Sequence, residues 1–193
     1  HERVAVPAMM GSHHAWCGAF AGALASAALP TDFPGRLGAG LVMTVIAART
    51  AHGRCSPDID LRGEGVCAHR RLFHWAPFLT AVATAFEAWI YYGWPSGDLL
   101  WPGALAVWAG WMAHLWGDFL FGQKTPTTTG PGIPIMSPYG PHHGLGWKVS
   151  TRWETGFVTV VVKPATVAAI AALLGVPALD ILDRVGSALG HLS

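Results

Sequence analysis

Carboxylate and imidazole side chains gather in one short stretch of an otherwise apolar chain. Asp58 and Asp60 lie in the motif Ser-Pro-Asp-Ile-Asp, and His69 and His74 open and close the motif His-Arg-Arg-Leu-Phe-His. Imidazole nitrogens and carboxylate oxygens without a thiolate suit zinc, or a harder ion such as manganese. The stretch therefore predicts a metal site. Since an ideal helix would point His69 and His74 about 140° apart, they serve one ion only if His69 precedes the helix.

A second pair of candidate ligands lies farther along the chain. His114 and Asp118 are four residues apart in Trp-Met-Ala-His-Leu-Trp-Gly-Asp. If this segment is helical, both side chains lie on one face and could share an ion. A hydrogen-bonded polar pair between helices is the alternative interpretation.

The remaining candidate ligands are scattered. His14 opens the first apolar run, although Gly-Ser-His-His also looks like vector sequence. Weaker candidates are His142, His143 and Glu154. A set of this size could hold two or three ions, with Asp58 or Asp118 bridging them.

The chemistry open to such a site is hydrolysis by metal-activated water. Arg70 and Arg71 suit an anionic substrate because guanidinium groups match phosphate oxygens, although they could equally be charges flanking a membrane span. We therefore assign Asp58, Arg70 and Arg71 as candidate catalytic residues. The chain has no nucleophile elbow, Walker loop or dinucleotide-binding fingerprint.

The elements that must position these residues are predicted to be membrane helices. The chain has 193 residues, of which 52% are hydrophobic and 12% charged, and ten are Trp. Soluble domains carry roughly 25% charged residues. The near-neutral net charge of +1 gives no nucleic-acid signature.

We predict a single all-α domain over residues 1–193, a polytopic bundle of about five spans with a polar metal-site face. The β-branched residues at 158–162 could also form a strand, but the length of their apolar run favours a helix. The predicted spans are residues 15–29, 37–48, 75–93, 99–122 and 157–179. Outside the spans lie an arm (1–12), a long site-side loop (123–154) and a tail (180–193).

Threading five antiparallel spans places every candidate ligand at one face of the membrane. Most Lys and Arg residues fall on the same face, which the positive-inside rule assigns to the cytoplasm. Gly18, Gly22 and Ser26 form a stripe of small residues on which helices can approach closely.

The order of the motifs resembles the YdjM-like family of bacterial inner-membrane metal-dependent hydrolases. An amino-terminal His, Pro-Asp-Ile-Asp, His-Arg-x-x-x-His and His-x-x-x-Asp follow one another, and residues 127–138 resemble the family's glycine-to-proline segment. The resemblance covers roughly residues 13–165. It implies a membrane helix bundle with these metal ligands: His14, Asp58, Asp60, His69, His74, His114 and Asp118.

The same order of His and Asp is also similar to zinc-dependent phospholipase C and P1-type nucleases, which implies phosphoester hydrolysis with several zinc ions. Two positions depart from the YdjM-like pattern. Many members have His-Arg-Gly where this chain has His-Arg-Arg at 69–71, and a Glu often follows the Thr-Gly pair where this chain has Phe157.

Three functions remain open on the sequence. The first is a zinc-dependent hydrolase of the bacterial inner membrane, with its site in the cytoplasm, acting on a membrane lipid or another phosphoester. The second is a membrane binding or assembly protein with a structural metal or polar cluster. The third is a transporter with Glu87, His114 and Asp118 as an ion relay. The oligomeric state is not predicted.

Overall fold

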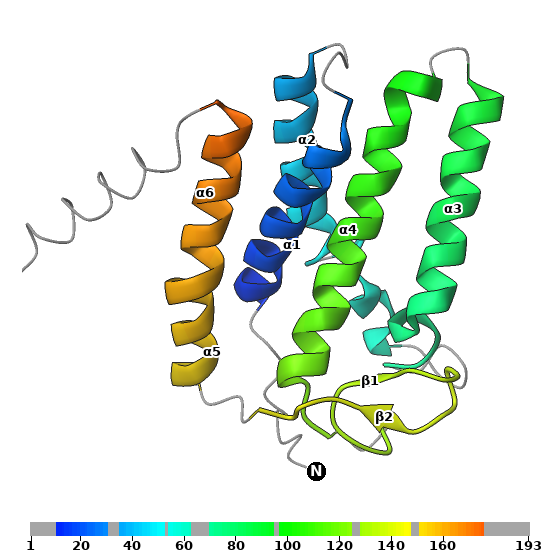
Figure 1. The fold of residues 1–193 in the computed structure, drawn as a ribbon. Coiled ribbons are helices and arrows are strands. Elements are labelled where there is room, and N and C mark those ends of the chain that lie inside the picture. Colours follow the sequence, from blue (N-terminus) through cyan, green and yellow to red (C-terminus); the bar gives the residue numbers. More distant parts are fainter. Residues whose placement is uncertain are drawn as a thin grey trace, which may run out of the picture.

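The chain folds as a helical bundle with a small hairpin at one end (Figure 1). The computed structural model describes residues 11–30, 35–52, 54–62, 70–94, 97–124, 128–147 and 151–175. The long helices are α1 (Gly11–Ala25), α2 (Arg36–Thr50), α3 (Ala76–Gly93) and α4 (Gly97–Phe121). A final helical rod consists of α5 (Thr151–Phe157), the π-helical turn η5 (Val158–Val162) and α6 (Lys163–Leu173). This mostly helical fold confirms the all-α prediction.

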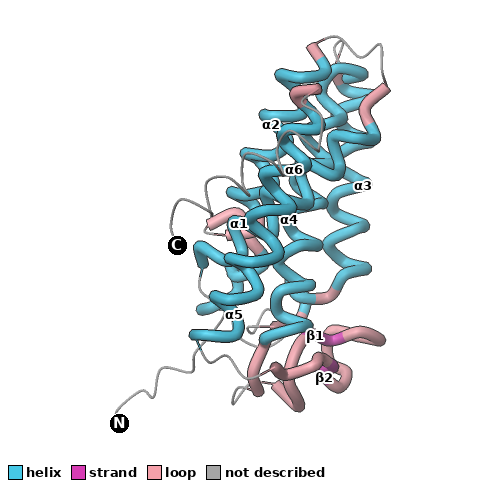
Figure 2. The backbone as a smooth tube through the Cα atoms, turned by 60° about the vertical axis from the view of Figure 1, so that its left-hand side comes forward, coloured by secondary structure: helices cyan, strands magenta, loops and turns pink. Residues whose placement is uncertain are grey.

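Short elements connect the helices. The 3-10 helices are η1 (Ser26–Ala28), η2 (Pro57–Arg62) and η4 (Leu72–His74). Strands β1 (Ile133–Pro134) and β2 (His142–His143) pair antiparallel, with Ile133 opposite His143. The hairpin lies at the end of the bundle where α1 begins and α4 ends, and the rotated view shows the same placement (Figure 2).

The helices match the predicted apolar runs, except that α1 begins at Gly11, within the predicted arm, instead of at residue 15, and that the last rod also begins early. This rod begins at Thr151 rather than near residue 157, so Glu154 lies on a helix and not in the long loop. The β-branched residues 158–162 form the π-helical turn within the rod, as the helical interpretation predicted. Pro102 lies inside α4, near the beginning of that helix.

Small residues let α1, α2 and α4 approach one another around Ala47, which is fully buried. A Cβ atom added to Gly18 would lie 2.4 Å from the Ala47 carbonyl oxygen, and one added to Gly22 would lie 2.7 Å from the Ala47 Cβ. A Cβ atom added to Gly110 of α4 would also lie 2.4 Å from the Ala47 carbonyl oxygen. The predicted close approach along the stripe of small residues on α1 is thus confirmed. It fixes the spacing of the helices that carry the candidate ligands.

Among the described residues, one helix is long and apolar enough to cross a membrane, Glu154–Leu173 with 20 residues. Length and composition alone are weak evidence, because a core helix of a soluble protein or a signal sequence meets the same test. Most of this helix is not buried inside the bundle, since only 17% of its apolar window is covered. The helices are therefore as predicted, whereas the five membrane spans stay a prediction.

Several predicted features lie outside the described residues. These are His69, most of the arm (residues 1–10) and the tail (180–193). Asp60 lies in η2, but the structure describes only its backbone.

Candidate metal centre

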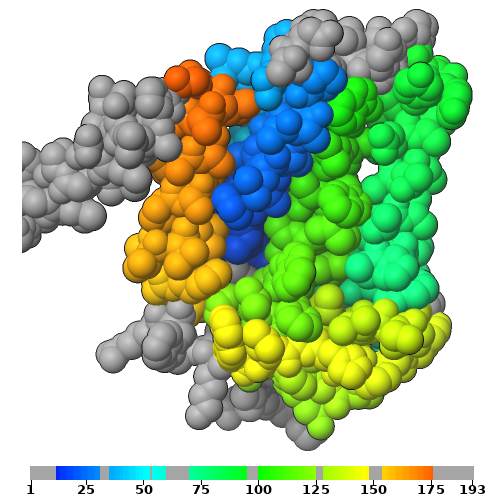
Figure 3. Space-filling view, viewed as in Figure 1, coloured from blue at the N-terminus to red at the C-terminus, as the bar shows by residue number. Residues whose placement is uncertain are grey.

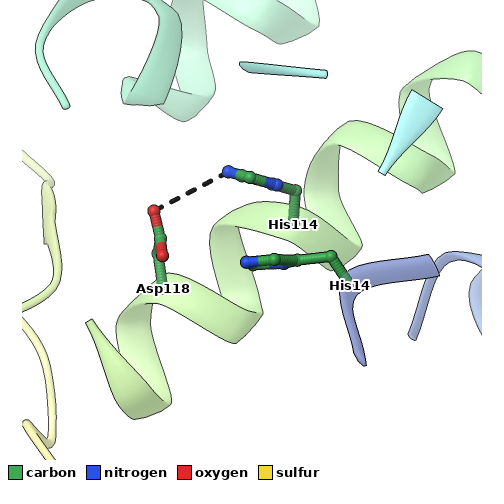
Figure 4. A group of neighbouring side chains, drawn as sticks. All are labelled: His14, His114 and Asp118. Atoms are coloured by element: carbon green, nitrogen blue, oxygen red, sulfur yellow. Dashed lines mark ion pairs between the residues drawn. The ribbon is translucent and has the colours of Figure 1, made fainter. Parts of the chain in front are cut away.

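His114 and Asp118 share one face of α4, as their spacing predicts, and His14 of α1 lies beside them (Figure 4). The His14 and His114 rings are stacked, with centroids 4.1 Å apart and planes inclined by 19°. Asp118 Oδ2 lies 3.7 Å from His114 Nε2. One potential ligand atom from each of these three residues lies within 4.8 Å of the other two. All three side chains are buried.

A second group shares His114 and adds Asp58 of η2 and His74 of η4. His74 Nε2 lies 3.3 Å from His114 Nε2, and Asp58 Oδ1 lies 3.5 and 3.4 Å from these two nitrogens. Zinc binds such atoms at about 2.0–2.1 Å, so tetrahedral geometry separates its ligand atoms by about 3.3–3.4 Å. The three atoms therefore have the spacing of one face of a zinc tetrahedron.

The tautomer of His114 suits a metal ligand. A carbonyl oxygen only accepts, so His114 Nδ1–H donates to the Ala51 carbonyl oxygen at 2.9 Å. In the neutral ring Nε2 then carries the lone pair, and this lone pair faces His74 and Asp58. A hydrogen bond to the second ring nitrogen is the usual way in which proteins orient a metal-binding imidazole.

His14 has a buried ring nitrogen, Nδ1, that no described residue satisfies with a hydrogen bond. Burying a polar atom without a partner costs free energy unless something else satisfies it. A cation near His14, His114 and Asp118 would do so. The two groups share His114, whose Nε2 can bind only one ion, so a second ion would rest on His14 and Asp118.

Asp118 is held by a buried arginine. Arg70 Nη2 donates to Asp118 Oδ1 at 3.1 Å, and Arg70 Nη1 donates to the Gln123 carbonyl oxygen at 2.8 Å. Asp118 Oδ2 is left to face His74 Nε2 at 3.2 Å. Arg70 is 2% exposed, so it orients a candidate ligand here instead of presenting its guanidinium to a substrate as the sequence predicts. Arg71 is half-buried, with its guanidinium over the Tyr139 ring.

Asp58 forms the accessible side of the cluster. Its side chain is 29% exposed, whereas those of His74 and His114 are almost fully buried. Burial raises the pKa of Asp58, but its contacts with the His114 and His74 imidazoles outweigh burial and hold the pKa well below its ordinary value. A carboxylate that stays ionised suits a metal ligand better than a proton acceptor. A ligand from solution would approach the cluster past Asp58.

The structure gives His142 a bracing contact. Its Nε2–H donates to the Arg70 carbonyl oxygen at 2.7 Å, and the backbone N–H of Thr129 donates to its Nδ1 at 3.4 Å. Burial lowers the pKa of this imidazole, so the neutral form that makes both contacts is favoured. Both ring nitrogens are thus engaged away from the ion groups. His142 ties the hairpin to Arg70, and its neighbour His143 is exposed.

Glu154 pairs with a histidine that the sequence did not single out. His13 Nδ1 and Glu154 Oε1 are 2.5 Å apart, and both side chains are almost fully buried. Neighbouring residues on a helix point about 100° apart, so His13 faces the last helical rod while His14 faces the cluster. The pair joins the beginning of α1 to α5 beside the candidate ligands.

The structure thus brings together five of the seven residues of the predicted metal set. These are His14, Asp58, His74, His114 and Asp118. It does not test His69 or the Asp60 side chain. Sequence reasoning missed His13 and the Ala51 carbonyl group. His13 and Glu154 are 141 residues apart, so no local pattern links them. Every residue has a backbone carbonyl group, so no residue type marks the one that Ala51 contributes.

No protein-family model matches the chain, and no curated protein or solved structure matches it.

Proposed function

We propose that this protein is a membrane-embedded, metal-dependent hydrolase, with zinc as its metal and a phosphoester as its substrate. The observation that carries the proposal is the group of His74, His114 and Asp58. These residues come from three separate elements, and their ligand atoms lie 3.3–3.5 Å apart. Catalytic zinc sites typically have three protein ligands and an open fourth position. The YdjM-like resemblance supports the same activity and remains part of the proposal.

Each residue of the cluster has a role in this scheme. His74 and His114 would bind the ion through Nε2, and Asp58 would bind it at the solvent side. His14 and Asp118 would hold a second ion, with Arg70 fixing the Asp118 carboxylate. A bound zinc ion would supply an activated water and stabilise charge on the phosphoryl oxygens. Arg71, nearer the surface than Arg70, is the arginine placed to attract an anionic substrate.

A membrane location is supported by the outer surface of the bundle, whereas the bacterial inner membrane and the cytoplasmic side rest on the family resemblance and the positive-inside rule. Large apolar side chains are exposed on several helices, among them Val45 of α2, Trp89 of α3 and Val160 of the last rod. Soluble monomers rarely expose apolar area on so many sides. A lipid is therefore the phosphoester that the site would meet most often.

A structural metal site is the second candidate, favoured by the burial of His14, His114 and Asp118. Structural zinc sites are closed by four ligands, whereas the exposure of Asp58 leaves this cluster open on one side. A transporter relay has less support, because Glu87 is exposed on α3 while His114 and Asp118 are buried on α4.

The first test uses purified protein in detergent, with zinc content and hydrolysis of a 4-nitrophenyl phosphodiester measured on the same samples. Asp118→Asn keeps an acceptor for Arg70 but removes the carboxylate charge, and Asp118→Ala removes both. We expect each variant to lower zinc affinity and turnover by on the order of a hundredfold or more, at least as much as loss of a residue supporting a ligand. Glu87→Gln, on an exposed acid, should retain both properties.

Full turnover in the Asp118 variants would exclude the proposal. Zinc bound stoichiometrically by the wild-type protein, without hydrolysis of any phosphoester tried, would favour the structural role instead.

A further inference from the structure

An apolar groove of about 680 Å³ runs between α1, α4 and the last helical rod. In the space-filling view α1 lies recessed between α6 and the carboxyl-terminal half of α4 (Figure 3). The lining of the groove includes Cys17, Ala21 and Leu24 of α1, Ala113 and Gly117 of α4, and Val161 of the rod. Small residues make up part of the lining, which also includes the aromatic residues Trp116 and Phe157.

The groove begins beside the candidate metal centre. On α1, Cys17 lies one helical turn beyond His14, and Ala21 and Leu24 continue the same face. On α4, Ala113 and Gly117 directly precede His114 and Asp118. The antiparallel α1 and α4 therefore carry both the ligands and the groove, which reaches the ligand end of α4 at Phe121 and continues over the turns away from it. A rise of 1.5 Å per residue places Ala21 about 10 Å and Leu24 about 15 Å from His14 along α1.

The groove and the cluster differ in chemistry in a way that matches one class of molecule. The groove is lined almost entirely by apolar side chains, so it would bind an alkyl chain through burial of methylene groups. The cluster gathers carboxylates and imidazoles that would hold cations, and bound cations attract a phosphate. An amphiphile with an anionic head and a long apolar tail complements both regions at once.

We propose that the substrate is a phosphoester lipid whose acyl or alkyl chain occupies this groove while its phosphate lies at the metal cluster. The inference rests on the proposed hydrolase function and adds the substrate class to it. In the reaction the oxygen of water forms a new bond to phosphorus, and the bond between phosphorus and the leaving oxygen breaks. One proton of the water goes to the leaving group or to solvent.

The test uses a series of alkyl 4-nitrophenyl phosphodiesters, from methyl to long alkyl chains, with the zinc-loaded protein in lipid nanodiscs. Release of 4-nitrophenolate gives kcat/KM for each chain length. In the wild-type protein we expect kcat/KM to rise with chain length until the groove is filled. Each methylene kept out of an apolar site weakens binding about fourfold.

Ala21→Trp and Leu24→Trp fill the groove at two distances from His14. We expect both to leave the methyl ester unaffected and to lower kcat/KM for the longest chain by about tenfold or more, the loss expected when two or more methylenes are excluded. The loss should begin at shorter chains for Ala21→Trp than for Leu24→Trp. Val45→Trp, at an exposed position on α2 outside the groove, should change nothing.

The outcomes separate the two proposals. If the wild-type protein does not hydrolyse even the methyl ester, the proposed function fails. If it does, but kcat/KM is independent of chain length or is unchanged by the groove variants, the groove proposal is overturned while the function stands. Should Ala21→Trp also slow the methyl ester, its packing is damaged, and Leu24→Trp at the more exposed position decides the question.

Discussion

Arg70 is the residue that holds Asp118, one of the candidate ligands, in place. It is buried, it holds Asp118 Oδ1, and its own carbonyl oxygen accepts from His142. Its backbone has a φ of 61°, a left-handed conformation that costs a non-glycine residue about 1–2 kcal/mol. The contacts of its guanidinium and carbonyl groups repay this strain. Arg70 thus joins the hairpin, the end of α4 and the Asp118 carboxylate.

Arg70→Met should therefore destabilise the metal-free protein. Arg and Met are equally strained by the left-handed backbone at this position. The change in stability therefore reports only the loss of the guanidinium group beside the buried Asp118 carboxylate. Breaking such a pair costs about 3–5 kcal/mol of unfolding free energy. Denaturant unfolding in detergent measures it, and added zinc should restore part of the loss by supplying another positive charge to Asp118.

Arg71→Met provides the matched control. Arg71 is half-buried over Tyr139, and a contact of this kind contributes about 0.5–1 kcal/mol. An equal loss of stability in the two variants, or no rescue of Arg70→Met by zinc, would show that the Arg70–Asp118 contact has no special role.

At the scale of elements, the approach of α1 to α2 aligns the ligands. The Ala47 carbonyl and Ala51 Cβ of α2 lie where a Gly18 side chain would extend, and the Ala51 carbonyl orients His114. His14 stacks on the same ring from one turn before Gly18. The Ala51 carbonyl therefore sets the tautomer of His114, and the approach of α1 to α2 sets the placement of His14 beside it.

Gly18→Ala should push the two helices apart. Its Cβ would lie 2.4 Å from the Ala47 carbonyl oxygen, and overpacking of this kind costs about 1–3 kcal/mol. We expect weaker zinc binding as well, because His14 and the Ala51 carbonyl would shift. Thermal unfolding and zinc titration in detergent would measure the two effects.

Gly38→Ala on α2 is the control, since no described atom lies within 4 Å of its added Cβ. That change should be neutral or should stabilise α2 by up to about 1 kcal/mol. If Gly18→Ala behaved like Gly38→Ala, the close approach would not be needed for the site.

The elements were largely predictable from sequence because apolar runs, small-residue stripes and turn residues are local signals. The sequence also predicted that the candidate ligands gather at one end of the bundle, because alternating helix directions return the chain to that end. These ligands are His14, Asp58, His74, His114 and Asp118. The detailed contacts did not follow. Arg70 could not be recognised as a buried support for Asp118, because a basic residue before a helix looks the same whether it faces a substrate or a carboxylate. Nor could the His13–Glu154 pair be foreseen.

At the scale of the whole molecule, the candidate ligands gather at one end of an apolar helical bundle. The ends of the elements that carry the ligands, the hairpin and the beginning of the last rod lie at one end of the bundle (Figure 1). Apolar side chains are exposed along the helices, and also beside the hairpin strands at Ile135 and Met136. A bilayer would cover such helices and leave the cluster end at the aqueous boundary. A lipid headgroup would then lie level with the cluster, and its chain would lie level with the groove.

The most direct test of the account is X-ray absorption at the zinc edge on the full chain after zinc addition. We predict stoichiometric zinc, with imidazole nitrogens and carboxylate oxygens at about 2.0–2.1 Å. In a His74→Ala, His114→Ala double variant the bound zinc and its imidazole signal should both fall. A folded wild-type protein that binds no zinc, or one whose zinc signal is unchanged in the double variant, would contradict the metal centre and the function built on it.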